Sequence, residues 1–216
     1  MIETVLFTIT AFAAGLSGAM VPGPMLTVTI SDSVKKGFKA GPLVVLGHYL
    51  AEIALIIVIL AGFSWLIGSN TAAMIIGTLG GIMLVFMGHN ISKSSKGSPD
   101  ISNGNGLTQR YGSVFGGIIT SISNPYFFIW WATIGMAFMF KGLEIAGLVG
   151  LIGFLVGHWS ADLSWYGLVS FFTGRGSNIM TDSHYKLIMK VCGIFLIILG
   201  VYFLVTAQLN NLQHLF

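Results

Sequence analysis

Charged residues are scarce in this sequence, and their scarcity excludes a water-soluble globule. Only 8% of the 216 residues are charged and 55% are hydrophobic, whereas soluble domains carry about 25% charged residues. Because so few charges cannot cover the surface of a folded chain, the long apolar runs between them are expected to face lipid. We therefore predict an all-α integral membrane protein with no separate catalytic domain in water.

Cysteine is nearly absent, which excludes further kinds of function. The single residue, Cys192, lies in an apolar run, so the chain can build neither an internal disulfide nor a dithiol redox centre. The net charge of +3 comes from basic residues in the polar breaks, where it indicates membrane topology. Nucleic acid is therefore not an expected partner, and no cofactor is predicted.

Six apolar stretches alternate with polar breaks along the chain. Each stretch is long enough to cross a hydrocarbon core of about 30 Å. We predict six transmembrane helices, at residues 3–30, 39–65, 71–92, 113–140, 143–172 and 185–208. The break between the fourth and fifth helices is expected at Lys141 and Gly142.

The basic residues indicate how these helices are oriented. Nine of the ten lie in or beside the three breaks on one side of the predicted bundle, and only Lys141 lies on the other side. Since basic loops stay in the cytoplasm, that side is predicted to be cytoplasmic and both termini are predicted to lie outside. The expected location is the plasma membrane, where lipid surrounds the chain, and a homo-oligomer is compatible with this arrangement.

The two halves of the chain resemble each other on either side of a Ser-, Gly- and Asn-rich stretch. The run GHYLAEI at 47–53 recurs as GHWSADL at 157–163, and GIMLVFMG at 81–88 recurs as GIFLIILG at 193–200. Because each half holds three predicted helices, an odd number, the two copies must insert in opposite orientations, as in many secondary transporters. We therefore predict two inverted three-helix repeats in one membrane domain. Their bounds are 1–92 and 112–216, joined by a flexible cytoplasmic linker at 93–111.

Two pairs of ionisable residues lie deep in the predicted helices. His48 and Glu52 form one pair and His158 and Asp162 the other, each with the i,i+4 spacing that places both side chains on one helix face. An ionisable residue at the bilayer centre costs about 2.5–3.5 kcal/mol, so such residues usually have a function. Burial disfavours the charged forms and the neighbouring charge favours them, so coupled pairs of this kind can exchange protons near neutral pH.

These four residues admit three interpretations. They could bind substrate and couple its transport to protons, or each pair could neutralise itself as a contact between helices. Alternatively, the four side chains together offer two nitrogen and two carboxylate ligands, a set that suits a divalent transition-metal cation. The metal site in that alternative consists of His48, Glu52, His158 and Asp162.

Prolines inside two predicted helices provide a second signal. Pro22, Gly23 and Pro24 lie in the first helix, and Asn124 and Pro125 lie in the fourth. Proline removes a backbone donor and clashes with the preceding turn, so both helices are predicted to break there. A broken helix is tolerated in a membrane where it lines a cavity, and the restarted half offers free N–H groups to a substrate carboxylate.

These motifs resemble the lysine exporter (LysE) family. The resemblance rests on GAMVPGP at 18–24, on the basic, glycine-punctuated KKGFKAG at 35–41, and on Asn124-Pro125-Tyr126. It extends over about residues 5–208 and implies a six-helix exporter that moves small amino acids outward against proton entry. The family's broken-helix motifs correspond here to Pro22, Gly23, Pro24, Asn124 and Pro125. Relatives in the wider superfamily export metal ions.

The sequence therefore predicts a secondary transporter, and not an enzyme, that exports amino acids or similar small zwitterions by proton antiport. The substrate carboxylate is expected near Pro24 and Pro125, and its ammonium group near Glu52 or Asp162. Export of a divalent metal cation is the alternative. An intramembrane protease is disfavoured because His48 and Glu52 form HxxxE, not the HExxH motif of zinc proteases.

Overall fold

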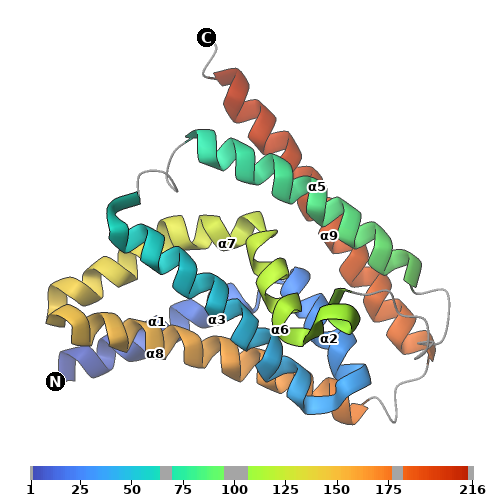
Figure 1. Ribbon diagram of the computed structural model, residues 1–216, viewed down its shortest axis with the longest axis horizontal. Helices are drawn as coiled ribbons and strands as arrows, with labels where there is room; N and C mark the ends of the chain where they lie inside the picture. The colour runs from blue at the N-terminus through green and yellow to red at the C-terminus, as the bar shows by residue number, and fades with distance from the viewer. Residues whose placement is uncertain (1, 64–69, 95–106, 177–181, 214–216) are drawn as a thin grey trace.

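The computed structural model describes residues 2–63, 70–94, 107–176 and 182–213, and these residues are helical almost throughout (Figure 1). Three helical stretches are long and apolar enough to cross a membrane, namely Ile2–Ala19, Pro24–Gly62 and Pro125–Gly176. Shorter apolar helices cover Met74–His89, Gly112–Ile122 and Gly193–Ala207. The all-α architecture agrees with the prediction from the sequence.

The first predicted helix is broken at its prolines, as expected. Helix α1 (Ile2–Ala19) ends four residues before Pro24, and helix α2 (Pro24–Lys36) begins at that proline. Gly23 is extended and precedes α2. Because proline has a fixed φ and no N–H, it is well suited to the first helical position and ends any helix that precedes it. A short 3₁₀ turn (Gly37–Lys39) then leads into α3 (Ala40–Val58), which continues as the π-helical segment Ile59–Phe63.

The fourth predicted helix breaks in the same manner. Helix α6 (Leu107–Ile122) ends before Asn124, and α7 (Pro125–Trp130) begins at Pro125. The π-helical segment Trp131–Gly135 and helix α8 (Met136–Gly176) follow. Both predicted proline breaks are therefore confirmed. Gly112 has a φ of 87°, which interrupts the helix and separates the first turn of α6 from the rest.

The break between the fourth and fifth predicted helices is displaced from its expected position. The chain remains helical through Lys141 and Gly142, and the non-helical residues are Ala146 and Gly147. Gly147 has a φ of 56°, which glycine adopts without the steric penalty that a Cβ brings. Gly142 instead packs directly against the backbone of Gly150 across the turn. The predicted break at Lys141-Gly142 was wrong. A polar lysine indicates a position at the surface of the protein, and it does not indicate where the backbone turns.

Helices α5 (Asn70–Ser94) and α9 (Asp182–Gln213) pack along each other and form a pair beside the other helices (Figure 1). Glycines make this approach close, since Gly81 lies against the Gly200 backbone and Gly88 against that of Gly193. These positions belong to the repeated GIMLVFMG and GIFLIILG runs. Most of the predicted linker, residues 95–106, lies outside the described residues, and α5 and α6 account for its two ends.

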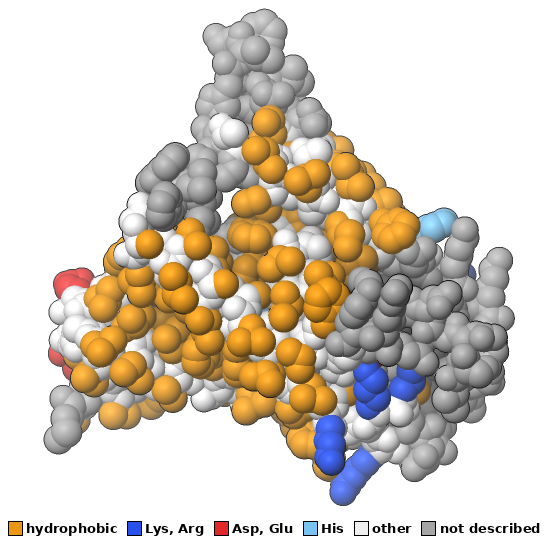
Figure 2. Space-filling view, viewed as in Figure 1, with side chains coloured by type: hydrophobic (Ala, Val, Ile, Leu, Met, Phe, Trp, Pro, Cys, Tyr) orange, Lys and Arg blue, Asp and Glu red, His pale blue; other side chains and the backbone are white. Residues whose placement is uncertain are grey.

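The outer surface is apolar and its charges lie at two ends. Figure 2 shows hydrophobic side chains over most of the visible face, with lysines and arginine gathered at one end and acidic residues at the opposite end. We call the first the basic end; its exposed residues include Lys35, Lys39 and Arg175. Glu3 and Glu144 are exposed at the other end. This distribution suits a bundle that crosses a bilayer, while the assignment of the basic end to the cytoplasm stays a prediction.

Reciprocal glycine contacts connect the two halves of the chain. Gly47 of α3 packs against the Val114 carbonyl of α6, and Gly157 of α8 packs against the Thr8 carbonyl of α1. Gly47 and Gly157 are the first residues of the repeated GHYLAEI and GHWSADL runs. Each copy thus contacts the broken helix of the other half. The repeats themselves stay a prediction.

We expect Gly47→Ala to destabilise the protein, because the added methyl group would collide with the α6 backbone. Overpacking of this kind costs about 1–3 kcal/mol, and the melting temperature of the detergent-solubilised protein should fall accordingly. Gly167→Ala is the matched control, since this helical glycine has no atom within 4 Å of an added Cβ. Equal melting temperatures for the two variants would contradict the close approach of α3 and α6.

Candidate functional site

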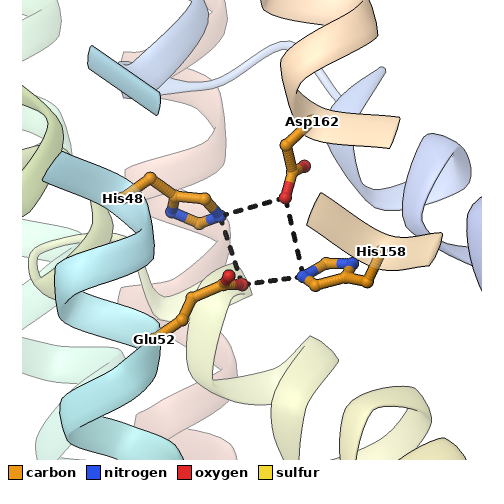
Figure 3. A group of neighbouring side chains, drawn as sticks. All are labelled: His48, Glu52, His158 and Asp162. Carbon is orange, nitrogen blue, oxygen red and sulfur yellow. Dashed lines mark hydrogen bonds and ion pairs between the residues drawn. The ribbon is translucent and has the colours of Figure 1, made fainter. Parts of the chain in front are cut away.

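The four ionisable residues singled out in the sequence meet in the centre of the bundle. His48 and Glu52 extend from α3, and His158 and Asp162 extend from α8 (Figure 3). One nitrogen or oxygen atom from each lies within 4.8 Å of the others. We call this group the quartet. The prediction that the two repeated faces meet is therefore consistent with the geometry.

The quartet is paired across the helices as well as along them. His158 Nε2 lies 2.8 Å from Glu52 Oε1 and His48 Nε2 lies 3.7 Å from Asp162 Oδ2. Within each helix, the His48–Glu52 distance is 3.2 Å and the His158–Asp162 distance is 3.6 Å. The shortest contact thus joins the two helices, whereas the i,i+4 spacing had indicated only the contacts within each helix.

Glu52 has a complete set of hydrogen-bond donors. Trp131 Nε1 donates to Glu52 Oε1 over 3.0 Å, and Trp159 Nε1 donates to Oε2 over 2.8 Å. His158 Nε2 adds a third contact to Oε1, and the side chain is 1% exposed. A buried carboxylate with three such partners is held in place as an ion. No motif in the sequence singles out Trp131, and Trp159 is marked only by its position beside the repeated histidine.

Asp162 differs sharply from Glu52. It is 3% exposed, and its Oδ2 atom has no hydrogen-bond donor among the described residues. The two histidine nitrogens, at 3.6 and 3.7 Å, are its nearest charged partners. An unsatisfied buried oxygen of this kind is costly, so it points to a group that binds something. Asp162 is therefore the member of the quartet that is open to a ligand.

The hydrogen bonds around His48 define its tautomer. Ser121 Oγ donates its only proton to the Gly117 carbonyl over 2.7 Å, so it must accept from His48 Nδ1, which lies 2.7 Å away. In neutral His48 the proton is then on Nδ1, and Nε2 faces the two carboxylates with a free lone pair. His48 can accordingly accept a proton inside the quartet.

His158 carries its proton on the opposite nitrogen. Its Nε2 donates to Glu52, while Nδ1 lies against Gly15 of α1 and has no partner among the described residues. Trp130 stacks on the imidazole ring at 4.5 Å between centroids and Phe154 stacks on it at 5.8 Å. These contacts fix the ring orientation, so the two histidines of the quartet are not equivalent.

A cavity of about 70 Å³ connects the quartet with both proline breaks. All four quartet residues line it, as do Pro22, Gly23 and Asn124 from the predicted broken-helix site. Pro24 and Pro125 are buried and do not line the cavity. Other lining residues include Gly18 of α1, Trp130 of α7 and Trp131 of the π-helical segment that follows α7. A cavity of this volume has room for several water molecules.

Helices α2 and α7, which begin after the two proline breaks, differ in the N-terminal ends that they present to this cavity. In α7, the Asn124 side chain accepts from the Tyr126 amide over 3.1 Å, and the Phe127 amide donates to the Asn124 carbonyl over 3.0 Å. In α2, Gly23 offers no side-chain cap, and the amides of Met25 and Leu26 have no acceptor among the described residues. Only the start of α2 therefore keeps the open N–H groups that were expected at both breaks.

Comparison with known proteins identifies the family. The family model described as LysE type translocator matches residues 16–207, which is most of the chain. No significant match was found among curated proteins or among solved structures. The matched region contains the quartet, the cavity and both proline breaks.

We expect Trp131→Phe to destabilise the protein more than Trp130→Phe. Both tryptophans are almost fully buried, but only Trp131 donates a hydrogen bond to Glu52, whereas Trp130 Nε1 has no partner. Loss of a hydrogen bond to a buried charge costs about 1–3 kcal/mol, beyond the smaller volume that both variants share. Thermal unfolding in detergent measures the difference. A Trp130→Phe variant as unstable as Trp131→Phe would refute the role of Trp131 in holding Glu52.

Proposed function

The chain belongs to the LysE type translocator family, so it is a membrane transporter, and we propose that it exports amino acids or similar small zwitterions across the plasma membrane by proton antiport. The observation that carries this proposal is a single cavity with an unsatisfied carboxylate, Asp162, and an uncapped helix start at α2. A zwitterion needs a negative and a positive partner at two separate points, and this cavity offers both.

The substrate carboxylate is assigned to the start of α2. The Met25 and Leu26 amides are open there, and the positive end of the helix dipole favours a negative charge. The side-chain amide nitrogen of Asn124 lies beside Gly23, and because its oxygen is engaged with Tyr126, the nitrogen is the free donor. Gly23 has no side chain that would cover these groups.

The substrate ammonium group is assigned to Asp162. Glu52 is the less suitable of the two acids, because its oxygens already accept from Trp131, Trp159 and His158. Asp162 Oδ2 lacks such donors, so an ammonium group would satisfy it without displacing a protein partner. This division of roles narrows the sequence-based expectation, which left Glu52 and Asp162 equivalent.

Proton coupling follows from competition at Asp162. A proton that enters from outside neutralises the carboxylate and removes its attraction for the ammonium group, so the substrate is released. His48 is suited to relay that proton, because its Nε2 can first take it up on the lone pair and then pass it to Asp162 Oδ2, which lies 3.7 Å away. Alternating access of two inverted repeats around the cavity would expose Asp162 to each side in turn.

We expect Asp162→Asn to abolish efflux driven by a proton gradient, because the amide neither attracts ammonium nor takes up a proton. Glu52→Gln should also abolish coupled efflux, and it should additionally lower the melting temperature because Gln cannot replace the charged acceptor. The assay uses proteoliposomes loaded with one radiolabelled amino acid at a time from a panel.

Glu144→Gln is the control for these variants, since Glu144 is exposed and pairs only with Lys141 at the surface, 3.0 Å away. It should leave efflux unchanged. Gradient-driven efflux retained by Asp162→Asn would refute the role of Asp162, whereas no amino-acid efflux from the unmodified protein would refute the proposed substrate class.

Export of a divalent metal cation is the second candidate, supported by the spacing of the quartet. In a tetrahedral site with metal–ligand distances of about 2.0–2.2 Å, neighbouring ligands lie roughly 3.3–3.6 Å apart. The four histidine–carboxylate distances are 2.8, 3.2, 3.6 and 3.7 Å. Two carboxylates would also balance the charge of a divalent cation.

The hydrogen bonds nevertheless favour the zwitterion. A metal ion on His158 Nε2 would move its proton to Nδ1, which lies against Gly15 and has no acceptor among the described residues. Histidines that bind metals usually donate from the other ring nitrogen.

We therefore expect proteoliposomes loaded with Mn(II), Zn(II) or Cd(II) to show no gradient-driven metal efflux, because metal binding would cost His158 its bond to Glu52. A metal-sensitive dye in the outer buffer measures efflux, and protein-free liposomes give the background leak. Metal efflux that is lost in His158→Gln, with no efflux of any amino acid, would favour the second candidate.

A further inference from the structure

Buried polar side chains are distributed unevenly along the bundle. Within the described residues, the buried polar and charged side chains lie at the level of the quartet or between it and the basic end. They are Thr27, Thr29, Asp32, Ser33, Glu52, Ser113, Thr120, Ser121, His158, Asp162 and Ser170. Those outside the quartet come from α2, α6 and the last part of α8. We call them the polar lane.

The half of the bundle on the other side of the quartet is apolar. Its buried residues form one hydrophobic cluster from α1, α3, the π-helical segment after α7, and α8. Phe7, Phe138 and Phe154 are in ring contact there, with Phe7 stacked on Phe138 at 5.7 Å and Phe138 beside Phe154 at 6.0 Å. Trp131 meets Phe154 edge to face. Among the buried residues of this outer cluster, the only N–H groups on side chains are those of Trp130 and Trp131, which contact His158 and Glu52 of the quartet.

Two polar contacts close the lane at the basic end. In the first, Ser113 of α6 donates to Asp32 Oδ2 over 2.6 Å, and Lys36 Nζ lies 2.8 Å from the same oxygen. Lys36 also donates to Ser113 Oγ over 3.0 Å. Asp32 is 2% exposed, although the sequence had placed it in a polar break. This contact joins the end of α2 to α6.

The second contact joins α2 to α8 and α3. Ser33 Oγ and Ser170 Oγ lie 2.8 Å apart and are fully buried. Ser170 Oγ donates to the Phe38 carbonyl over 2.8 Å and accepts from the Gly41 amide over 3.1 Å. Like the first contact, it is made of polar groups that water can replace when the helices part.

Thr29 lies between these contacts and the cavity. It is fully buried, yet its Oγ1 has no hydrogen-bond partner among the described residues. Thr27, two residues closer to the cavity along α2, donates to the Gly23 carbonyl over 3.2 Å. An unsatisfied hydroxyl at a fully buried site indicates a position that another polar group, such as water or substrate, occupies at some stage.

We propose that the polar lane is the route by which substrate enters the cavity from the basic end, and that the Asp32–Lys36–Ser113 contact is its gate. The outer cluster closes the opposite side. Because Lys36 joins α2 to α6, loss of its charge removes a lock between these helices and lets water reach Thr29. This proposal requires that the chain is a transporter and that its basic end is cytoplasmic, and it does not depend on the substrate class.

The test measures how quickly a cysteine in the lane reacts. Thr29→Cys in a Cys192→Ser background is reacted with a membrane-impermeant maleimide, applied to inside-out vesicles and separately to right-side-out vesicles. We expect slow labelling with Lys36 present and about tenfold faster labelling with Lys36→Met, in inside-out vesicles only. Lys36→Arg keeps the charge and should retain slow labelling.

Two controls separate opening of the gate from general loosening. Ala11→Cys lies fully buried in the outer cluster, so its labelling should stay slow with Lys36→Met. Ser113→Ala removes one contact of Asp32 and should accelerate Thr29→Cys labelling by a smaller factor, which tests the gate if Lys36→Met does not fold. Unchanged labelling of Thr29→Cys in both variants, acceleration at Ala11→Cys, or acceleration from the opposite side would each overturn the proposal.

Discussion

The burial of Glu52 is the constraint on which the centre of this protein depends. A carboxylate at membrane depth is tolerated only with donors close at hand, and Glu52 takes them from Trp131, Trp159 and His158. These donors belong to two segments distant in sequence, the π-helical segment after α7 and helix α8. Satisfying one buried charge therefore fixes α3, α7 and α8 relative to one another. The cavity takes its shape from that arrangement.

One difference between the repeated runs explains why the two acids are not equivalent. Tyr49 and Trp159 occupy matching positions, directly after the two histidines, and their rings stack at 4.9 Å. Trp159 donates its indole N–H to Glu52, whereas the Tyr49 hydroxyl donates to the backbone carbonyl of Trp159 and not to Asp162. Asp162 is thereby left without the donor that its counterpart has. A symmetric pattern thus holds one anchored and one open carboxylate.

The sequence could predict the parts of this structure that depend on local rules. Proline determines where α2 and α7 begin, and i,i+4 spacing with a repeated Gly-His motif identified the quartet. It could not predict contacts made only by the assembled bundle, such as the donation from Trp131 to Glu52 or the burial of Asp32 beneath α6. The turn at Gly147 was misplaced because polarity marks the surface, whereas the turn depends on backbone conformation and on close packing of Gly142 against Gly150.

Charge balance within the quartet gives a physical reason why the proposed transporter would exchange substrate for protons and move neither alone. Glu52 is held by its three donors, so in the proposed cycle the charge that changes is the one at Asp162, whose Oδ2 has no donor among the described residues. A proton neutralises Asp162, whereas a bound zwitterion pairs its ammonium group with Asp162 and its carboxylate with the positive end of α2, so in both states Asp162 has a partner. When Asp162 is ionised and binds neither substrate nor a proton, it carries an uncompensated charge in a medium of low dielectric. Such a charge costs several kcal/mol or more. In the proposed cycle the bundle therefore cannot switch access from one side of the membrane to the other while Asp162 is ionised and empty. Outward movement of substrate and inward movement of protons are thus coupled.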